Sequence, residues 1–175
     1  MLYFCLMTTA YLGSIEYYRR LLREEVSLDF SVPYRKQTSM NRCLIDSPHG
    51  ALALTVPVVK PHGRMPVGEI LISEHGNWRH QHWNALVSSY RQTPYFDYYE
   101  EDFHPFYHER RWERLADFNN GLHQTVMRLL EPFPLVPEDR RRDTPYYQMF
   151  ASRHDFIPNL SIVDLLFNMG PEAVY

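Results

Sequence analysis

The first 30 residues follow a pattern that limits which topologies the chain can adopt. An apolar run at residues 1–7 is followed by Thr8-Thr9, then by a helical pattern from Gly13 to Arg23, and then by alternating apolar and polar residues at 26–30. Ser14 stands where it can cap the helix, whose apolar positions share one face. This order predicts a βαβ unit, in which the two strands run parallel with a right-handed crossover.

The middle of the chain predicts further strands. Residues 41–46 and 51–58 should pair antiparallel, because Pro48-His49-Gly50 forms a short turn between them. A short strand at 69–73 is expected after a loop rich in proline and glycine at 60–68. We therefore predict an α/β fold, with a small mixed sheet opened by the βαβ unit and a mainly helical C-terminal half.

Helical patterns dominate the rest of the chain, at residues 77–91, 95–130 and 161–169. Asn77 is a candidate cap for the first of these helices. Pro105 or Gly121 is expected to kink or divide the second helix, because proline and glycine both weaken helix interiors.

The C-terminal segment combines a connection with a buried helix. Residues 131–145 contain four prolines and should form a solvated connection, and residues 146–151 are expected to form a last strand. The helix at 161–169 is apolar almost all round and should be buried, with Ser161 and Asp164 spaced as a capping box.

Length and composition predict one cytoplasmic domain over residues 1–175. The chain is 45% hydrophobic and 22% charged, as globular proteins are. Its net charge of −3 offers no general attraction to a phosphate backbone, so we expect no nucleic-acid partner. The apolar start has no basic leader and is shorter than the roughly 20 residues of a membrane span, so we expect neither export nor a span. Cys5 and Cys43 are then expected to be reduced thiols.

The densest set of polar donors follows the predicted parallel strands. Ligands of such units bind beyond the carboxyl ends of the strands, so residues 8–13 and the segment after Phe30 should face one crevice. The candidate ligand-binding residues there are Tyr11, Lys36, Gln37, Asn41 and Arg42. Their hydroxyl, ammonium, amide and guanidinium groups suit sugars, carboxylates and phosphates. A charged, protected strand edge is the alternative interpretation.

Histidine supplies the candidate catalytic group. His82 lies on the apolar face of the helix at 77–91, where it is either a buried general base or a hydrogen-bonded core residue. His104 and His108 have a spacing that suits a metal, but Pro105 and the aromatic neighbours favour ordinary packing, so we predict no metal site. Cys43 would act as a nucleophile only with a base beside it. No motif for a known cofactor is present, and the cofactor stays unknown.

One family pattern runs in order through most of the chain, at residues 9–18, 34–38, 41–43, 54–58, 77–83, 90, 94–96 and 156–170. Taken together, these segments resemble the WbqC-like protein family, in the compact form found in Bacteroidetes. The chain departs from the commoner QPTYLPW-type opening of the family, and its region 131–148 is short. The resemblance implies a bacterial protein linked to O-antigen and related surface-polysaccharide gene clusters. It implies modification of sugar precursors, with acyl or aminoacyl transfer as the candidate reactions, but no set of catalytic residues.

We therefore expect a cytoplasmic transferase that acts on a sugar or nucleotide-sugar precursor, with a small anionic or sugar molecule as its ligand. Lys36 and Arg42 would hold an anionic group, Tyr11 would orient the sugar, and His82 would be the base. The alternative is a non-enzymatic binding or assembly protein of the envelope pathway that docks a partner through its aromatic-rich segment, residues 94–112. The substrate, the donor and the oligomeric state stay open.

Overall fold

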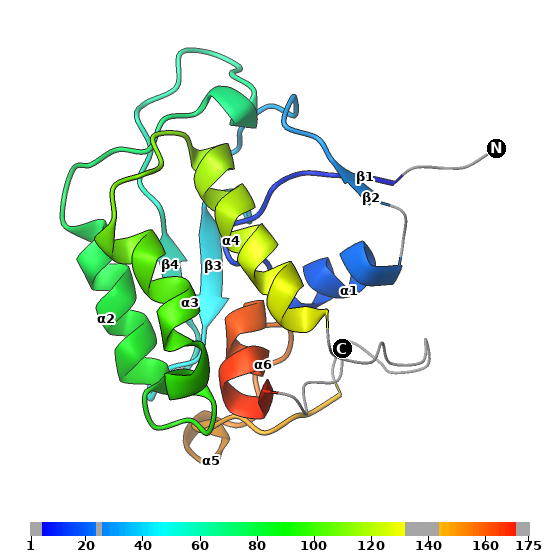
Figure 1. Cartoon of the computed structure of the whole chain (residues 1–175), viewed down its shortest axis with the longest axis vertical. Coiled ribbons are helices and arrows are strands. Elements are labelled where there is room, and N and C mark those ends of the chain that lie inside the picture. The colour runs from blue at the N-terminus through cyan, green and yellow to red at the C-terminus, as the bar shows by residue number, and fades with distance from the viewer. Residues whose placement is uncertain (1–4, 24–25, 132–143, 171–175) are drawn as a thin grey trace.

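The computed structural model describes residues 5–23, 26–131 and 144–170, in which short strands precede a mainly helical half (Figure 1). The elements are β1 (Cys5–Met7), α1 (Ile15–Arg23), β2 (Val26–Leu28), β3 (Arg42–Ile45), β4 (Leu52–Thr55), the 3₁₀ helix η1 (Val67–Glu69), α2 (Trp78–Tyr90), α3 (Phe96–His108), α4 (Leu115–Leu130), α5 (Ala151–His154) and α6 (Ile162–Met169). The predicted α/β class is confirmed. None of the helices in the described part of the chain has the length and apolar character that crossing a membrane requires.

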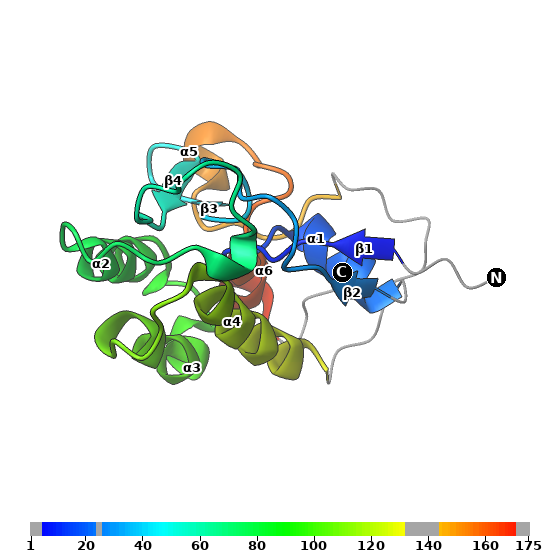
Figure 2. The same cartoon turned by 90° about the horizontal axis from the view of Figure 1, so that it is seen from above.

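The strands form two separate sheets of two strands each. β1 pairs parallel with β2, so the chain does open with strand, helix and parallel strand. β3 pairs antiparallel with β4, with Arg42 opposite Thr55. Figure 2 shows the β1–β2 pair set apart from the β3–β4 pair. The predicted parallel and antiparallel pairs are thus both present, but they belong to two sheets that no strand joins within the described residues.

The expected strand at residues 69–73 is wrong. Val58 and Ile72 form one isolated bridge, and Leu71 and Arg114 form another. The segment therefore pairs with two different neighbours through one residue each and forms no continuous ladder with either. A strand needs consecutive paired residues, and this segment changes partner from one residue to the next. It ties the chain after β4 to the residues that precede α4.

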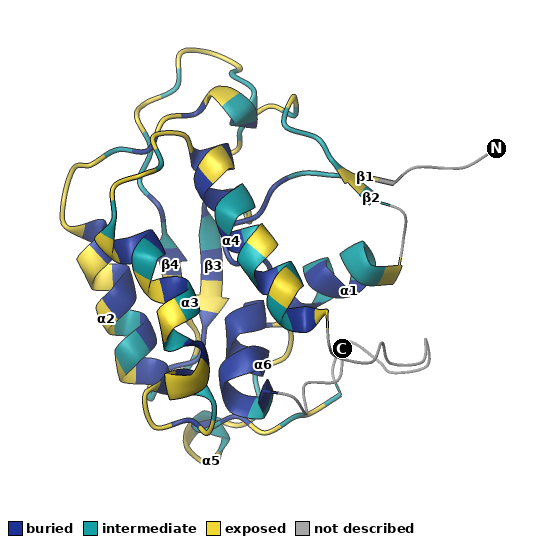
Figure 3. Ribbon diagram, in the orientation of Figure 1, coloured by how far each residue is buried: buried dark blue, intermediate teal, exposed yellow. Residues whose placement is uncertain are grey.

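Helix α6 lies at the centre of the molecule, and every residue from Ile162 to Asn168 is buried (Figure 3). Helices α1, α2 and α3 all contact it. The ring of Phe167 lies 5.1 Å from those of Tyr90 and Phe96 and 5.6 Å from that of Phe103. The predicted burial of this helix is confirmed, because a helix that is apolar all round needs neighbours on all sides.

The long helical segment at 95–130 divides at residues 109–114, and not at either predicted residue. Pro105 lies inside α3, and Gly121 lies inside α4. The break occurs because Glu113 and Arg114 pair with the extended chain at residues 71–72: the Ile72 N–H donates to the Glu113 carbonyl, 2.8 Å away. Backbone groups used in this pairing cannot continue a helix.

Only one of the predicted helix caps forms. The Tyr17 N–H donates to Ser14 Oγ at 3.3 Å, which confirms Ser14 as the cap of α1. Asn77 makes no side-chain cap hydrogen bond. The capping box is wrong, because Ser161 Oγ donates to the Leu12 carbonyl and the Asp164 carboxylate accepts from Tyr90 of α2 and from Tyr146.

The connection before α6 differs in part from its prediction. Most of the expected solvated connection, residues 132–143, lies outside the described residues. The expected strand at 146–151 is wrong, because this stretch is irregular and leads into α5. Its side chains are engaged with α6: Gln148 Nε2 lies 3.2 Å from Asp164 Oδ2, and the Met149 N–H donates to Asn168 Oδ1.

Candidate functional site

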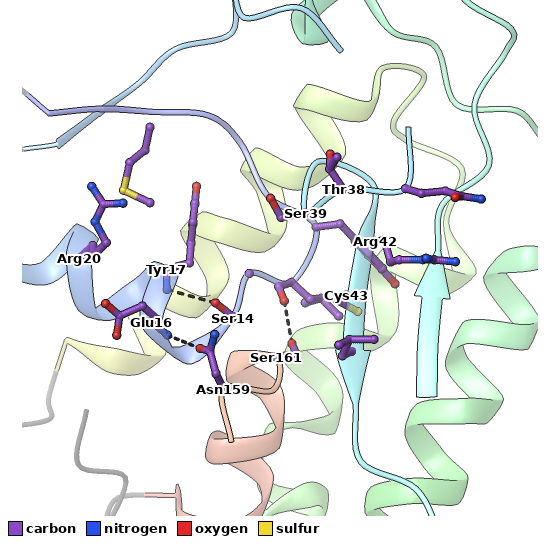
Figure 4. Close-up of a pocket in the computed structure, with 16 residues that line it drawn as sticks. Ser14, Glu16, Tyr17, Arg20, Thr38, Ser39, Arg42, Cys43, Asn159 and Ser161 are labelled. Atoms are coloured by element: carbon purple, nitrogen blue, oxygen red, sulfur yellow. Dashed lines mark hydrogen bonds between the residues drawn. The ribbon is translucent and has the colours of Figure 1, made fainter. Parts of the chain in front are cut away.

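A pocket of about 530 Å³ opens at the carboxyl end of β1, between α1 and β3. Its wall includes Met7, residues 11–14, the first turns of α1, the turn at 37–39, the start of β3 and two residues that precede α6. Figure 4 shows Tyr17 and Arg20 on the α1 side and Arg42 on the β3 side. The predicted crevice, with residues 8–13 facing the segment after Phe30, is therefore a real cavity in the structure. This pocket is called the α1–β3 pocket below.

Contacts between distant parts of the chain hold the wall of this pocket together. The Tyr11 N–H donates to the Ser39 carbonyl at 2.8 Å, which joins the loop after β1 to the turn before β3. The Ile162 N–H donates to the Gly13 carbonyl at 2.9 Å. Ser161 Oγ donates to the Leu12 carbonyl at 2.8 Å. Residues from both ends of the chain therefore fix the position of one short loop.

Unusual backbone conformations gather at the α1–β3 pocket. Four non-glycine residues in the described part of the chain have a clearly positive φ, and three of them line it: Leu12 (41°), Gln37 (59°) and Asn159 (53°). This left-handed region costs most L-residues about 1–2 kcal/mol, although asparagine adopts it more readily, so surrounding contacts must hold Leu12 and Gln37 in it. Strain of this kind collects at binding and catalytic sites, where it presents groups that relaxed backbone could not.

Side chains hold two of these strained residues in place. The Gln37 N–H donates to Asn41 Oδ1 at 3.0 Å, and Asn41 Nδ2 donates to the Val56 carbonyl. Asn159 Oδ1 accepts the Glu16 N–H at 3.0 Å, in the first turn of α1. Asn41 is buried, and both of its polar atoms are used in this way, so its geometry suits shaping the pocket rather than touching a ligand.

The other predicted binding residues have different positions. Gln37 and Arg42 line the α1–β3 pocket, and Lys36 is exposed next to it but outside the lining. Arg42 Nε donates to Thr55 Oγ1 at 2.9 Å, so its side chain extends from β3 towards β4 (Figure 4). The structure thus brings Gln37 and Arg42 to one cavity with the backbone of Tyr11, and leaves Lys36 at its margin.

The side chains of Tyr11 and His82 lie behind the pocket wall. Tyr11 is fully buried, with its hydroxyl 2.8 Å from His82 Nδ1 and 2.9 Å from the Tyr107 hydroxyl. Burial lowers the pKa of His82 to about 4, so the ring is neutral near pH 7. This geometry gives neither side chain direct access to the cavity and suits them to holding the wall.

A model of the WbqC-like protein family matches residues 10–132 and 139–175, which include every lining residue of the α1–β3 pocket except Met7. The chain belongs to the WbqC-like protein family. No curated protein and no solved structure gives a significant match to it.

Glu16, Tyr17 and Arg20 of α1 are among the pocket residues of this WbqC-like chain that were not predicted from the sequence. The Tyr17 hydroxyl donates to the Thr8 carbonyl at 3.0 Å, and its ring covers Gly13 so closely that a Cβ there would lie 2.5 Å from Tyr17 Cδ1. The sequence could have indicated these three residues, because they lie on the face of the helix opposite its apolar positions, and this helix begins directly after the loop at residues 8–13.

Two other candidates of this WbqC-like chain also have clear positions. Cys43 lines the α1–β3 pocket, but burial raises the pKa of its thiol, which disfavours the thiolate that a nucleophile requires. His104 and His108 are exposed, with their rings stacked 3.6 Å apart. Across the described residues, no cluster of three or more histidine, cysteine, aspartate or glutamate side chains suits a metal ion.

Proposed function

We propose that the α1–β3 pocket binds a small anionic or sugar molecule, and that the chain is a transferase modifying a sugar or nucleotide-sugar precursor in surface-polysaccharide biosynthesis. Membership of the WbqC-like family suggests a role in polysaccharide-related biosynthesis. The observation that carries the proposal is that three non-glycine residues with positive φ lie together on one pocket that also holds several polar side chains.

The chemistry of the lining supports a ligand of this class. Arg20 and Arg42 offer guanidinium groups for a phosphate or carboxylate, and Gln37, Thr38 and Ser39 offer amide and hydroxyl groups. Sugar hydroxyls both donate and accept hydrogen bonds, as these groups do. The cavity, at about 530 Å³, is within the range of about 300–1,000 Å³ that small-molecule sites occupy.

The transfer step needs a group that accepts a proton from the sugar. Glu16 is the one carboxylate among the described residues that line the pocket, and we assign it this role in place of His82. In an acyl or aminoacyl transfer, the sugar amine or hydroxyl would attack the acyl carbon, its proton would pass to Glu16, and the donor's leaving group would depart. His82 would act indirectly, by holding Tyr11.

Titration calorimetry with a panel of nucleotide sugars and acyl donors tests the binding proposal. We expect at least one nucleotide sugar to bind, and Arg20→Ala and Arg42→Ala each to weaken it about tenfold, which corresponds to about 1.4 kcal/mol. Arg64→Ala is the matched control, because Arg64 is an exposed arginine outside the pocket. Equal binding by the wild type, both pocket variants and the control would show that the site is elsewhere.

Glu16→Gln separates catalysis from binding. It keeps the size and shape of the side chain and one acceptor oxygen, replaces the other oxygen with an NH2 donor, and cannot accept the proton. We expect it to bind the same nucleotide sugar within about twofold of the wild type, while transfer from an acyl donor falls about 100-fold or more. Transfer at the wild-type rate would exclude Glu16 as the base.

The alternative of a docking protein has less support from the structure. Of the rings that motivated it, Tyr107 is buried in the core, and the Trp112 ring stacks 4.6 Å from that of Phe106. Tyr98 is 75% exposed. Most of this aromatic segment therefore builds the interior, and one exposed ring does not make a docking surface.

A further inference from the structure

We infer that a second cavity, at the amino end of α2, binds a small anion such as a phosphate or carboxylate group. Its volume is about 190 Å³, and it lies between the start of α2, the end of α3 and the residues that precede and follow them. It shares no lining residue with the α1–β3 pocket, so the inference goes beyond the proposed function. This cavity is called the α2 cavity below.

The first turn of α2 presents open backbone donors to this cavity. The helix has 13 residues, and Asn77 provides no side-chain cap. Its first backbone hydrogen bond runs from the Gln81 N–H to the Asn77 carbonyl, and within the described chain the N–H groups of residues 78–80 have no partner. Residues 78–80 all line the α2 cavity, at the end of the helix where the dipole is positive.

A buried arginine in the cavity wall is the second, independent observation. Arg79 is only 6% exposed, and its two terminal nitrogens donate to the Phe106 carbonyl and to Glu74 Oε1. Arg79 Nε and the indole Nε1 of Trp78 are buried and have no hydrogen-bond partner among the described residues. Buried donors without partners are costly, and a negative charge beside them lowers that cost.

Glu74 shows that a carboxylate fits at this place. Its Oε1 lies 2.9 Å from Arg79, and its Oε2 lies 3.9 Å from Nε of Arg110. The side chains of Glu74 and Arg110 are 44% and 78% exposed, so both are accessible to a ligand from solvent. Arg79, Arg110 and the amino end of α2 all line the cavity, and Glu74 is the one carboxylate among its described lining residues, which leaves net positive charge for a second anion.

The two cavities are separate but meet at one pair of tyrosines. Tyr107 lines the α2 cavity, and its hydroxyl lies 2.9 Å from that of Tyr11, whose residue lines the α1–β3 pocket. Both residues are buried, so this contact directly links one lining residue of each cavity. Because the two cavities share no lining residue, phosphate binding at the α2 cavity can be tested with variants that leave the α1–β3 pocket intact.

Titration with inorganic phosphate, followed by ¹H–¹⁵N NMR at constant ionic strength, tests the inference. We expect saturable shifts of the amides of residues 78–80. Arg110→Ala should weaken binding about fivefold, the upper range for an exposed charge pair. Glu74→Gln should strengthen it, because the competing carboxylate is gone. A parallel titration with acetate identifies which anion class the cavity prefers.

Arg111→Ala is the matched control for these variants. Arg111 is the next residue along, is 65% exposed and pairs with Glu109, but does not line the α2 cavity. It should leave phosphate binding unchanged. Equal weakening by Arg110→Ala and Arg111→Ala would reveal diffuse attraction instead of a site and would overturn the inference. Amide shifts that do not saturate with either phosphate or acetate would also overturn the inference. That result would leave the proposed function untouched if a nucleotide sugar still binds at the α1–β3 pocket.

Discussion

Tyr11 and His82 form a buried hydrogen bond that ties the wall of the α1–β3 pocket to helix α2. The Tyr11 hydroxyl lies 2.8 Å from His82 Nδ1. Burial keeps the ring neutral near pH 7, and in the tautomer with its proton on Nε2 the Nδ1 atom accepts the Tyr11 hydroxyl proton. The Tyr11 oxygen is then free to accept the Tyr107 proton.

Removing the Tyr11 hydroxyl should therefore destabilise the protein. Tyr11→Phe leaves His82 Nδ1 and the Tyr107 hydroxyl buried without a partner, and we expect the free energy of unfolding to fall by about 1–3 kcal/mol. Urea denaturation measures this. Tyr98→Phe is the control, because Tyr98 is 75% exposed and should change stability by less than about 0.5 kcal/mol. Equal effects of the two variants would contradict a special role for the buried hydroxyl.

Gly170, which follows α6, should not tolerate a side chain. It has a φ of +50°, and a Cβ there would lie 2.4 Å from the Tyr95 ring. Gly63 also has a positive φ, of +69°, but nothing lies within 4 Å of its Cβ position. We expect Gly63→Ala to cost about 1 kcal/mol and Gly170→Ala about 2–4 kcal/mol in thermal unfolding. Similar costs would mean that Tyr95 moves aside without penalty.

Asp164 should make stability depend on pH. Burial raises its pKa to about 6 from the ordinary 3.8, despite hydrogen bonds from Tyr146 and Tyr90 that lower it. The folded state therefore holds this proton more tightly than the unfolded state, and stability falls as pH rises from about 4 to 6. Asp164→Asn has no carboxyl group to ionise, so its stability should not fall in this way. The free energy of unfolding of the variant should therefore increase relative to that of the wild type between about pH 4 and 6, by on the order of 2 kcal/mol.

Asp29→Asn is a control of opposite sign for this measurement. Hydrogen bonds from Ser31 lower the pKa of the exposed Asp29 carboxyl. Its ionised form therefore favours folding, so the wild type gains stability as pH rises through the acid range. Asp29→Asn lacks this gain, and its free energy of unfolding should decrease relative to that of the wild type over the same range. Denaturation curves at several pH values measure both differences. If the stability of both variants relative to the wild type changed in the same direction with pH, the direction of the pKa shift given for Asp164 or for Asp29 would be wrong.

His154 should stabilise the fold more in acid than in base. Its ring nitrogens face the carbonyls of Asp155 and Ser47, each 2.9 Å away, and Nε2 also lies 3.1 Å from Asp46 Oδ1. Desolvation lowers the pKa of His154, but these acceptors together raise it above its usual value. The stabilisation is present at low pH and is lost as pH rises through the folded-state pKa, so His154→Gln should destabilise the protein more at pH 5 than at pH 8. Equal losses at the two pH values would exclude a role for the charged ring.

Local patterns in the sequence were enough to predict the elements that build the α1–β3 pocket. Periodicity placed β1, α1 and β2, the Ser14 cap and the buried helix α6, because each depends on residues within a few positions of one another. The rule for βαβ units also predicted that the loop before α1 and the turn with Gln37 would meet at one edge.

Only the tertiary structure decided which partners the polar groups have. Asp164 bonds to Tyr90 and Tyr146 and not to its own helix end, and Asn41 holds the backbone of Gln37. The break between α3 and α4 arises from pairing with residues more than 40 positions earlier in the chain. The sequence by itself determined where helices and strands can form, since that depends on neighbouring residues. The surroundings of His82 and the amino end of α2 depend on contacts between distant segments, which a local pattern does not encode.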